Sequence, residues 1–459
     1  MRSIVDKCDF FTYNTYEVMA MLVRFSVKNY KSFKDLTTFS MVAGKHTRHK
    51  NHVFIAEDKR LLKGSVIYGA NASGKTNLIR AIQFGRNVAL KGLKEINISD
   101  LFYRIDKRSF SKPGIFQYDF YSNGNFYSYG FALSYEKQII ISEWLYIQND
   151  ENEICVFERN HGEKMKTTFK FTKQNKHRFE IYGDDVDDKN TFLCDMIRKK
   201  VNKESEFKAF FDVGSWLSNL IFIFPQTKLN SNEYYNSLES QFELERLLKY
   251  FDTGIERVSG REVEAEKALS FLDERNREEI LSDIFELLNT DKKSVVSASI
   301  FGKRFSFKMK KEKIYASLLF MNHGNELDLF DFNDESDGTK RLFDLIPLFS
   351  KGKTDCVIFV DELDRSFHTK LTIEFIRTFY EKTKNSPSQL IATLHDENVM
   401  DLNLLRQDEI WFVERKEHCS RLYPLSEFKE RFDKIISKEY IQGRYGAIPY
   451  FDPQWIKDE

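Results

Sequence analysis

The chain has 459 residues, enough for one large domain or two to three ordinary ones, each with a sizeable core. Hydrophobic residues make up 41% of the chain and aromatic residues 15%, which is typical of a folded globular protein and excludes a disordered one. The 70 basic residues balance the 70 acidic ones, which excludes a chain-wide basic field of the kind that coats nucleic acid. Any nucleic-acid surface must therefore be local.

The cysteines and the start of the chain indicate the compartment. Five cysteines lie far apart and form no Cys-x-x-Cys pair, which favours reduced thiols over a disulfide framework. No apolar run reaches the length that spans a bilayer, and residues 1–20 lack the apolar core of a secretion signal. We therefore expect a soluble, cytoplasmic protein with no membrane partner, and we interpret residues 1–20 as a candidate non-native or disordered N-terminal extension.

Residues 21–68 predict an opening β unit, whose first strand covers residues 22–27. A basic segment with three histidines, residues 45–52, lies within this unit. Histidines at this spacing can bind a metal ion, but no carboxylate or cysteine joins them in the sequence. We therefore interpret this segment as a solvated loop.

The most informative stretch spells Gly-x-x-x-x-Gly-Lys-Thr at residues 69–76, between an apolar β-prone run and a helical pattern. Strand, glycine loop and helix in this order form a phosphate-binding loop, because the glycines let backbone N–H groups turn toward phosphates. Lys75 is placed to reach the β- and γ-phosphates of a nucleotide, and the Thr76 hydroxyl to bind Mg²⁺. A glycine turn that carries a lysine by chance is the weaker alternative. The predicted nucleotide-contacting residues here are Gly69, Asn71, Ala72, Ser73, Gly74, Lys75, Thr76 and Asn77.

After the helix that follows the glycine loop, the sequence period changes to two. Residues 115–147 alternate between apolar and polar side chains, and Asn123-Gly124 interrupts the alternation. Asn-Gly between two alternating runs is the strongest short signal for a β-hairpin. The stretch therefore predicts an antiparallel β meander beside the nucleotide core.

Residues 188–290 are rich in Glu, Lys and Leu and lack sustained heptads, so they predict a compact helical insertion. The flanking residues, 21–187 and 291–459, are then two lobes of one nucleotide-binding unit. Within the second lobe, residues 303–311 interleave Lys and Phe. This pattern suits either a surface that follows a phosphate backbone or an edge strand protected by lysines, and we favour the edge strand.

A second informative stretch is Cys-Val-Ile-Phe-Val at residues 356–360, followed by Asp361 and Glu362. Five apolar residues predict a fully buried strand with two carboxylates at its end. In a nucleotide site, Asp361 orients the Mg²⁺ shell and Glu362 polarises the attacking water. A buried strand that merely ends in exposed acids is the alternative, and the glycine loop makes it the weaker one.

Three further pieces surround this strand. Ser336 and Gly338 stand at the start of an apolar helix, where backbone N–H groups and the helix dipole form an anion site. Asp364 lies in a short turn before an amphipathic helix over residues 369–383. His395 follows a second apolar strand, where an imidazole can contact a γ-phosphate as donor and sensor. Each piece is weak alone, but their order indicates one nucleotide-hydrolysing site.

The order of these motifs resembles an ABC-type ATPase head, the group that includes the SMC and RecF heads. Within this group the chain is similar to the RloA-like ATPases, which are filed among AAA ATPases and are related to the ATPase subunit of PARIS and to the OLD proteins. The resemblance implies an α/β fold, a P-loop ABC/SMC-type ATPase head with an antiparallel β subdomain and a helical insertion. The segments that carry the closer similarity are residues 22–33, 68–77, 361–366, 408–414 and 442–449.

The resemblance also implies Mg²⁺-dependent hydrolysis of ATP, with Glu362, His395 and Lys75 as the catalytic residues. Thr76 and Asp361 are then the metal-binding residues. The glutamine that usually senses the nucleotide in such heads is either Gln226 or Gln148. The chain's last family-like segment, residues 442–449, has no chemistry assigned to it.

In ABC-type ATPases the glycine loop of one subunit and the signature motif of another enclose each nucleotide. The resemblance therefore implies a homo-oligomer, a head-to-tail dimer that ATP closes and hydrolysis opens. Ser336, Gly338 and Asp364 are its expected nucleotide-contacting residues outside the glycine loop. The signature here lacks the usual Leu-Ser-Gly-Gly-Gln letters, so its assignment rests on Ser336 and Gly338 alone.

The resemblance suggests antiviral defence, in which an ATPase senses phage infection and controls a separate toxic effector such as a nuclease. Only about sixty residues follow His395, too few for the Toprim nuclease of OLD proteins, so a nuclease must be a separate partner. The alternative is a RecF- or SMC-like repair ATPase that clamps DNA, suggested by basic segments at residues 45–60 and 303–313.

Overall fold

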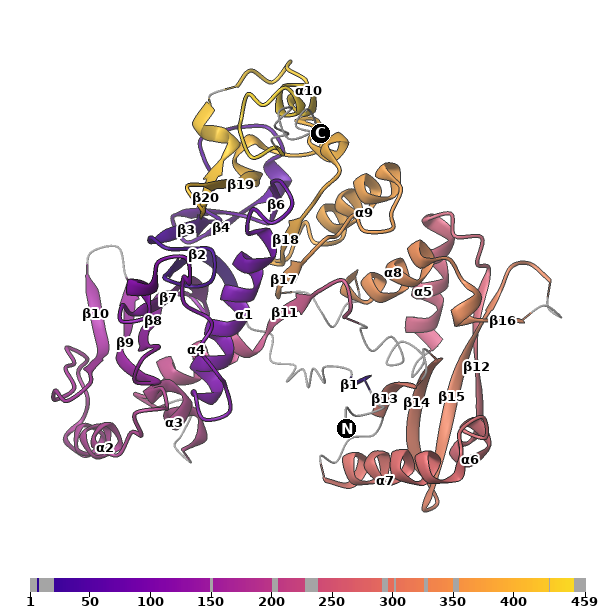
Figure 1. Cartoon of the computed structure of the whole chain (residues 1–459), viewed down its shortest axis with the longest axis horizontal. Helices are drawn as coiled ribbons and strands as arrows, with labels where there is room; N and C mark the ends of the chain where they lie inside the picture. Colours follow the sequence, from indigo (N-terminus) through magenta and orange to yellow (C-terminus); the bar gives the residue numbers. More distant parts are fainter. Residues whose placement is uncertain are drawn as a thin grey trace, which may run out of the picture. The chain divides into compact units, whose positions relative to one another are not determined.

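The computed structural model divides the chain into two compact units, each described by itself (Figure 1). The larger unit consists of Thr15–Phe224, Thr354–Asp364 and Phe375–Glu459, and the smaller unit of Met1–Asn14, Pro225–Lys353 and Arg365–Glu374. The residues that the structure describes are 6–7, 20–148, 152–199, 205–227, 238–290, 296–300, 303–325, 329–349, 355–428 and 430–449. The predicted N-terminal extension, residues 1–20, therefore lies outside the described residues except for residues 6–7 and 20.

A mainly parallel six-stranded sheet in the larger unit carries the glycine loop and the acid-bearing strand. Its order is β11-β17-β18-β6-β19-β20, in which neighbours from β11 to β19 are parallel and β20 is antiparallel to β19. Strands β6, β17 and β18 are buried along their whole length, which explains their nearly continuous apolar sequences. The bounds are β6 Gly64–Tyr68, β11 Leu220–Ile223, β17 Val357–Val360, β18 Gln389–Thr393, β19 Ile410–Lys416 and β20 Cys419–Pro424.

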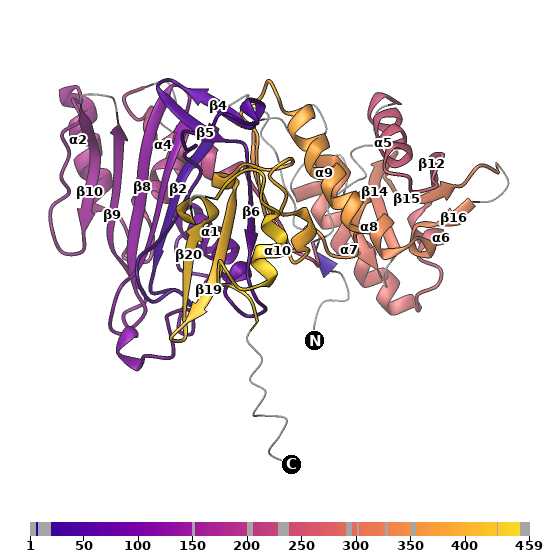
Figure 2. The same ribbon diagram turned by 90° about the horizontal axis from the view of Figure 1, so that it is seen from above.

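The larger unit also has an antiparallel six-stranded sheet of order β10-β9-β8-β7-β2-β3 (Figure 2) and a two-stranded sheet of β4 (Val53–Ala56) and β5 (Lys59–Leu62). Asn123 and Gly124 have φ values of 50° and 81° and join β7 to β8, so the predicted hairpin and meander are confirmed. The bounds are β2 Ala20–Lys28, β3 Thr37–Ser40, β7 Gly114–Ser122, β8 Asn125–Ser134, β9 Ile139–Gln148 and β10 Glu153–Asn160.

Helix α1 (Lys75–Lys91) connects the two sheets of the larger unit. Its buried residues, among them Leu78 and Val88, share one core cluster with Phe116 of β7 and Ile391 of β18. The Tyr118 hydroxyl of β7 donates to the Ile82 carbonyl of α1 at 2.6 Å. The other helices with residues in this unit are α2 Lys173–Asp184, α3 Phe192–Arg198, α4 Lys208–Ser218, α9 Thr369–Lys382 and α10 Ile436–Ile441.

The smaller unit has an antiparallel sheet of order β1-β13-β14-β15-β12, with β16 on β15. Helices α6 and α7 share a core cluster with β13, β14 and β15. Helices α5, α6 and α7 come from residues 188–290, the predicted helical insertion, but that range also contains the strand β12. Residues 188–224 of the same range belong to the larger unit and include β11. The bounds are β1 Asp6–Lys7, β12 Arg257–Glu264, β13 Val296–Ile300, β14 Lys303–Lys310, β15 Lys313–Asn322, β16 Leu329–Asp331, α5 Leu238–Tyr250, α6 Ala265–Ala268, α7 Glu274–Thr290 and α8 Asp337–Leu345.

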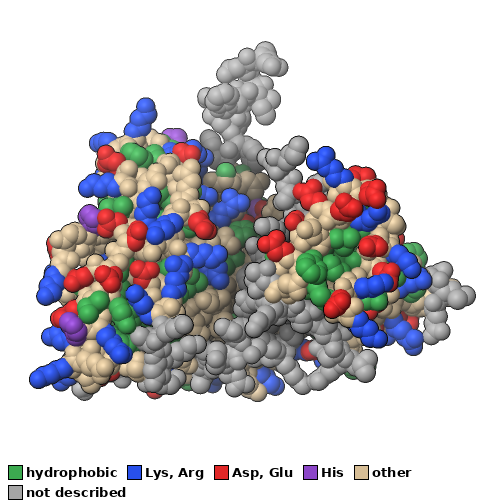
Figure 3. Space-filling model, turned by 90° about the horizontal axis from the view of Figure 1, so that it is seen from below, with side chains coloured by type: hydrophobic (Ala, Val, Ile, Leu, Met, Phe, Trp, Pro, Cys, Tyr) green, Lys and Arg blue, Asp and Glu red, His purple; other side chains and the backbone are tan. Residues whose placement is uncertain are grey.

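The lysine-rich strand β14 corrects one prediction. It lies between β13 and β15, so the expected edge strand is an interior one. Lys308 and Lys310 pair with the Glu262 carboxylate at 2.5 and 2.7 Å, and Lys313 pairs with Glu264 at 3.0 Å. On the face shown in Figure 3, basic and acidic side chains are likewise interspersed on each unit.

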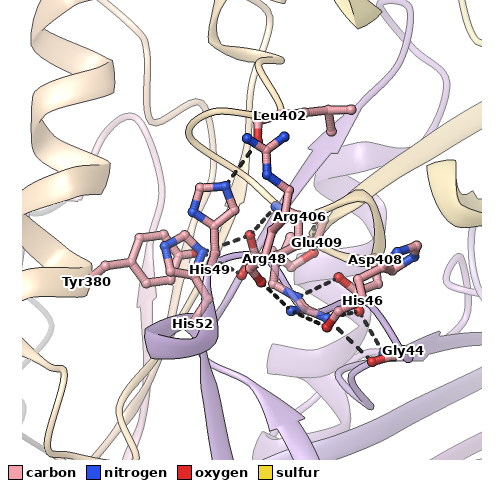
Figure 4. A network of polar contacts seen from close by, with 11 residues as sticks. Gly44, His46, Arg48, His49, His52, Tyr380, Leu402, Arg406, Asp408 and Glu409 are labelled. Atoms are coloured by element: carbon pink, nitrogen blue, oxygen red, sulfur yellow. Dashed lines mark hydrogen bonds and ion pairs between the residues drawn. The ribbon is translucent and has the colours of Figure 1, made fainter. Parts of the chain in front are cut away.

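The histidine segment, residues 45–52, agrees only in part with the predicted solvated loop, because most of its residues are exposed but its last histidine is buried (Figure 4). His52 ends the short 3₁₀ helix η1 (Lys50–His52) and is only 4% exposed. Its Nδ1 atom lies 3.0 Å from a carboxylate oxygen of Glu409, and its ring stacks on the ring of Tyr380 at 3.4 Å. A carboxylate distant in sequence therefore does join the segment, and within the described residues no group of three side chains suits a metal ion.

Within the described ranges, no helix combines the length and apolar character needed to cross a membrane. Cys155, Cys194, Cys356 and Cys419 are free thiols, as predicted, and Cys8 lies outside the described residues.

Candidate nucleotide-hydrolysing site

The glycine loop follows β6 directly and leads into α1, in the strand–loop–helix order that the sequence predicts. Gly69 has φ 156°, and a Cβ atom there would lie 2.3 Å from the Val413 carbonyl oxygen of β19. Gly74 has φ 119°, and a Cβ atom there would lie 2.2 Å from the Ser420 hydroxyl oxygen of β20. Both positions therefore require glycine, for backbone conformation and for space.

Two neighbouring elements hold the loop from outside. The Ser420 hydroxyl donates to the Ser73 carbonyl, and the Ser420 backbone N–H donates to the Ser32 carbonyl at 2.8 Å. The Asn77 side-chain amide, predicted to contact nucleotide, donates to the Ser32 hydroxyl at 2.9 Å. The strand β20 thus holds the loop through the Ser420 side chain, and the turn after β2 holds the start of α1 through the pair of Ser32 and Asn77.

The remaining loop residues leave polar groups for a ligand. Asn71 and Ala72 are exposed at the loop, and Ala72 adopts a left-handed φ of 62°. The buried Ser73 hydroxyl has no hydrogen-bond partner among the described residues. Lys75 is 6% exposed, and its ammonium group donates to the Gly69 carbonyl at 2.5 Å. Since phosphate oxygens are strong acceptors, a hydroxyl without a partner and a lysine folded over its own loop fit a triphosphate.

Burial lowers the pKa of Lys75 below its ordinary value, and the nearby carboxylates of Asp361, Asp364 and Glu362 oppose this shift. A lysine that is poorly hydrated gains more from a phosphate partner than an exposed one does. The electrostatics of this pocket therefore favour an anionic ligand beside Lys75.

The predicted metal-binding pair is brought together across the sequence. The Thr76 hydroxyl donates to a carboxylate oxygen of Asp361 at 2.9 Å, and Asp361, which follows β17, is 2% exposed. A hydroxyl and a carboxylate are the hard oxygen ligands that Mg²⁺ prefers. The donor set therefore fits a magnesium ion held between α1 and the end of β17.

The two predicted catalytic residues of the strand ends also lie near each other. The Nε2 atom of His395 is 3.9 Å from a carboxylate oxygen of Glu362. Glu362 has a left-handed φ of 51°, which is uncommon for a residue with a side chain. Asp364 turns its carboxylate to the backbone N–H groups of His395 and Asp396, both at 2.6 Å. Asp364 thereby positions the segment after β18.

Sequence reasoning missed Thr393, the last residue of β18. Its hydroxyl donates to a carboxylate oxygen of Asp361 at 2.8 Å and accepts the Glu362 backbone N–H at 2.8 Å. Thr393 is fully buried. The only signal in the sequence was a hydroxyl side chain near the end of an otherwise apolar strand.

Ser336 and Gly338 belong to the smaller unit, whereas the residues described above belong to the larger one. Ser336 stands at the start of α8, as predicted, and it caps this helix, because its hydroxyl accepts the Thr339 backbone N–H at 3.1 Å. Gly338 is so close to the Ser366 carbonyl oxygen that a Cβ atom would lie 2.7 Å from it. A contact of Ser336 and Gly338 with nucleotide stays a prediction.

The two candidate glutamines occupy different surroundings. Gln148 ends β9 of the antiparallel sheet. Gln226 comes three residues after β11, whose last residue, Ile223, accepts the Asp361 backbone N–H at 2.8 Å. Gln226 itself belongs to the smaller unit, so the choice between the two glutamines stays a prediction.

With this geometry established, comparisons with known proteins identify the family. The family described as "AAA domain, putative AbiEii toxin, Type IV TA system" matches residues 65–401, more than half of the chain. The chain belongs to this AAA-domain family. The matched range of the AAA-domain protein includes the glycine loop, Asp361, Glu362 and His395. The P-loop ATPase fold predicted from the sequence is thereby confirmed.

Three solved structures of SMC heads are similar to the AAA-domain protein. An SmcHead bound to the C-winged helix domain of ScpA has a TM-score of 0.41 at 13% identity and covers 89% of this chain and 99% of its own. The SMC head domain from Thermotoga maritima has a TM-score of 0.35 at 14% identity and covers 88% of this chain and 98% of its own. The third structure is the Smc head domain with an extended coiled coil, bound to the C-terminal domain of ScpA and derived from Pyrococcus furiosus. It has a TM-score of 0.36 at 15% identity and covers 93% of this chain and 100% of its own. No curated protein matches the chain.

Proposed function

We propose that this protein binds ATP with Mg²⁺ and hydrolyses it. The observation that carries the proposal is the hydrogen bond between Thr76 of the glycine loop and Asp361 after β17, because it joins two motifs 285 residues apart in one oxygen-rich site. Membership of an AAA-domain family supports the same function.

Each residue of the site has a chemical task in this proposal. The backbone N–H groups of the loop and Lys75 bind the phosphates, while Thr76 and Asp361 hold the metal, which neutralises phosphate charge when bound. Glu362 accepts the proton of the attacking water, and His395, within reach of Glu362, donates to the γ-phosphate. Asp364 orients the His395 backbone and so sets the position of that imidazole.

The site also supports a two-state switch. Ser336 and Gly338 present a helix start, and in a head-to-tail dimer this start would meet the γ-phosphate bound to the partner subunit. ATP would then favour the closed dimer because it contacts both subunits only in that state. Hydrolysis removes the bridging phosphate and releases the dimer.

We further propose that this switch serves a bacterial anti-phage system of the RloA-like type and controls a separate toxic effector, such as a nuclease. The resemblance of residues 361–366 and 442–449 to that group supports this role, as does a family description that names a toxin. The DNA-clamping alternative has less support, because Lys308, Lys310 and Lys313 of its basic segment are paired with glutamates.

The test of the chemistry is ATP hydrolysis by purified protein. Wild type should hydrolyse ATP, Lys75→Ala should lose nucleotide binding, and Glu362→Gln should bind ATP but lose hydrolysis on the order of 10²-fold or more. Glu381→Gln, at an exposed glutamate of α9, is the matched control and should keep the wild-type rate. Wild-type turnover by Glu362→Gln would refute the assignment of the base.

The test of the biological role is recovery of partners from the native host with Glu362→Gln as bait and ATP present. Lys75→Ala is the control, since it should not close. A stoichiometric nuclease that is absent from the control supports the defence role. Recovery of DNA without a protein companion supports the DNA clamp and refutes control of an effector.

A further inference from the structure

Thr393 is a buried side chain that contacts both the metal-binding residue Asp361 and the water-activating residue Glu362 of the candidate site. We propose that Thr393 is a positioning residue that sets Asp361 and Glu362 in their working orientation for ATP hydrolysis. The inference rests on the proposed function and deepens it by adding a residue that none of the sequence motifs includes.

The sheet topology places Thr393 at this point. β18 lies between β17 and β6, with Val360 opposite Ala392, so the residue after β17 and the last residue of β18 are neighbours. The Thr393 carbonyl accepts the Leu363 backbone N–H at 3.1 Å, in addition to the two bonds of its hydroxyl. Thr393 therefore holds three consecutive residues, 361 to 363, from one side.

The hydroxyl is used in both of its roles at once. The Thr393 hydroxyl donates a hydrogen bond to one carboxylate oxygen of Asp361. The other carboxylate oxygen of Asp361 accepts a hydrogen bond from the Thr76 hydroxyl at 2.9 Å. The lone pair of the Thr393 hydroxyl receives the Glu362 backbone N–H. Only a hydroxyl offers one donor and one acceptor on the same small atom, so valine, which has the same shape, can form neither bond.

The bond to the Glu362 backbone has a specific consequence, because Glu362 is left-handed at φ 51°. Such a backbone persists when its surroundings fix it, and the side-chain direction of Glu362 follows from it. Loss of the Thr393 hydroxyl frees this peptide to turn, which moves the carboxylate that activates water. Among the described residues, the hydrogen bonds of the Thr393 hydroxyl go to Asp361 and Glu362 and not to the glycine loop or Lys75, so we expect nucleotide binding to be spared.

The experiment compares Thr393→Val, Thr393→Ser and wild type in steady-state ATP hydrolysis and in equilibrium ATP binding. Thr393→Val should lose on the order of 10²-fold in kcat, as expected for a small misplacement of a reacting group, with Kd for ATP close to wild type. Thr393→Ser keeps the hydroxyl and should restore most of kcat. Thr378→Val is the matched control and should leave kcat unchanged, because it removes a buried α9 hydroxyl that has no hydrogen-bond partner within the described part of the chain.

Each outcome is decisive. Wild-type kcat for Thr393→Val overturns the inference, and so does a Thr393→Ser protein that is as slow as Thr393→Val. If Thr393→Val fails to fold, the serine variant alone decides, because a mere packing role predicts that loss of the methyl group harms it. Absence of hydrolysis by wild type refutes the proposed function instead.

Discussion

Lys63 is a buried lysine whose lowered pKa should make the free energy of unfolding depend on pH. It lies between β5 (Lys59–Leu62) and β6, is 1% exposed, and its ammonium group donates to the Thr383 carbonyl. Burial lowers its pKa from 10.5 to about 8. Because the folded protein releases this proton at lower pH than the unfolded chain does, the contribution of Lys63 to the free energy of unfolding increases as pH rises from 8 to 10.5.

We expect Lys63→Met to remove this increase. From pH 8 to pH 10, the free energy of unfolding of wild type should therefore rise relative to that of Lys63→Met by on the order of 2 kcal/mol. Urea titration at each pH measures both values. Lys384→Met, at an exposed lysine near Thr383, is the control and should parallel wild type. Equal pH slopes for Lys63→Met and wild type would contradict the prediction.

A network centred on Glu409 connects distant elements (Figure 4). The Glu409 carboxylate contacts His52 of η1 and accepts the Tyr380 hydroxyl of α9 at 3.1 Å and the Arg406 backbone N–H at 2.8 Å. The Arg406 guanidinium in turn binds Asp408 through two bonds of 2.8 and 2.7 Å. These contacts tie η1 and α9 to the start of β19, the strand beside β6.

Replacement of Glu409 should therefore destabilise the larger unit strongly. We expect Glu409→Ala to lower the free energy of unfolding by about 2–4 kcal/mol, because three buried donors lose their acceptor. Chemical denaturation measures this, with the exposed Glu427→Ala as a control that should change stability little. A loss for Glu409→Ala no larger than that of the control would show that the network adds no stability.

The elements that sequence predicts well are those with a local signature. The glycine loop, the strand that ends at Asp361, the Asn123-Gly124 hairpin and the Ser336 cap each depend on residues within a few positions of one another. Long-range partners were not predictable, since the His52–Glu409 contact joins residues 357 apart.

The lysine-rich strand shows a second reason for error. Residues 303–311 look like a protected edge, but neither the pairing with β13 nor the glutamates of β12 that neutralise its lysines can be inferred from the strand itself. Thr393 was missed because its contacts depend on the register between β18 and β17, which places its hydroxyl beside Asp361 and Glu362, the two residues that follow β17.

For the whole molecule, the proposed switch predicts nucleotide-dependent association. In MgATP, Glu362→Gln should have the molar mass of a dimer by light scattering, and Lys75→Ala should have that of a monomer under the same conditions. Adding Ser336→Arg to Glu362→Gln should abolish the dimer but keep ATP affinity, because a large cation at this helix start blocks the partner's phosphate and not the subunit's own loop.

Ser270→Arg, at an exposed serine of the smaller unit, is the matched control in the Glu362→Gln background and should still dimerise. Dimers that form equally well with Ser336→Arg would remove Ser336 from the interface and with it the head-to-tail arrangement.

The order of strands around β6 has a consequence for how the protein is made. β6 and the glycine loop leave the ribosome early, but both strands that flank β6, β18 and β19, begin only at residues 389 and 410. The nascent chain therefore carries its phosphate-binding sequence through most of translation without the neighbours that shape it. We therefore expect a nascent chain to gain nucleotide binding only after β20 has been synthesised, because Val413 of β19 and Ser420 of β20 lie against the glycine loop.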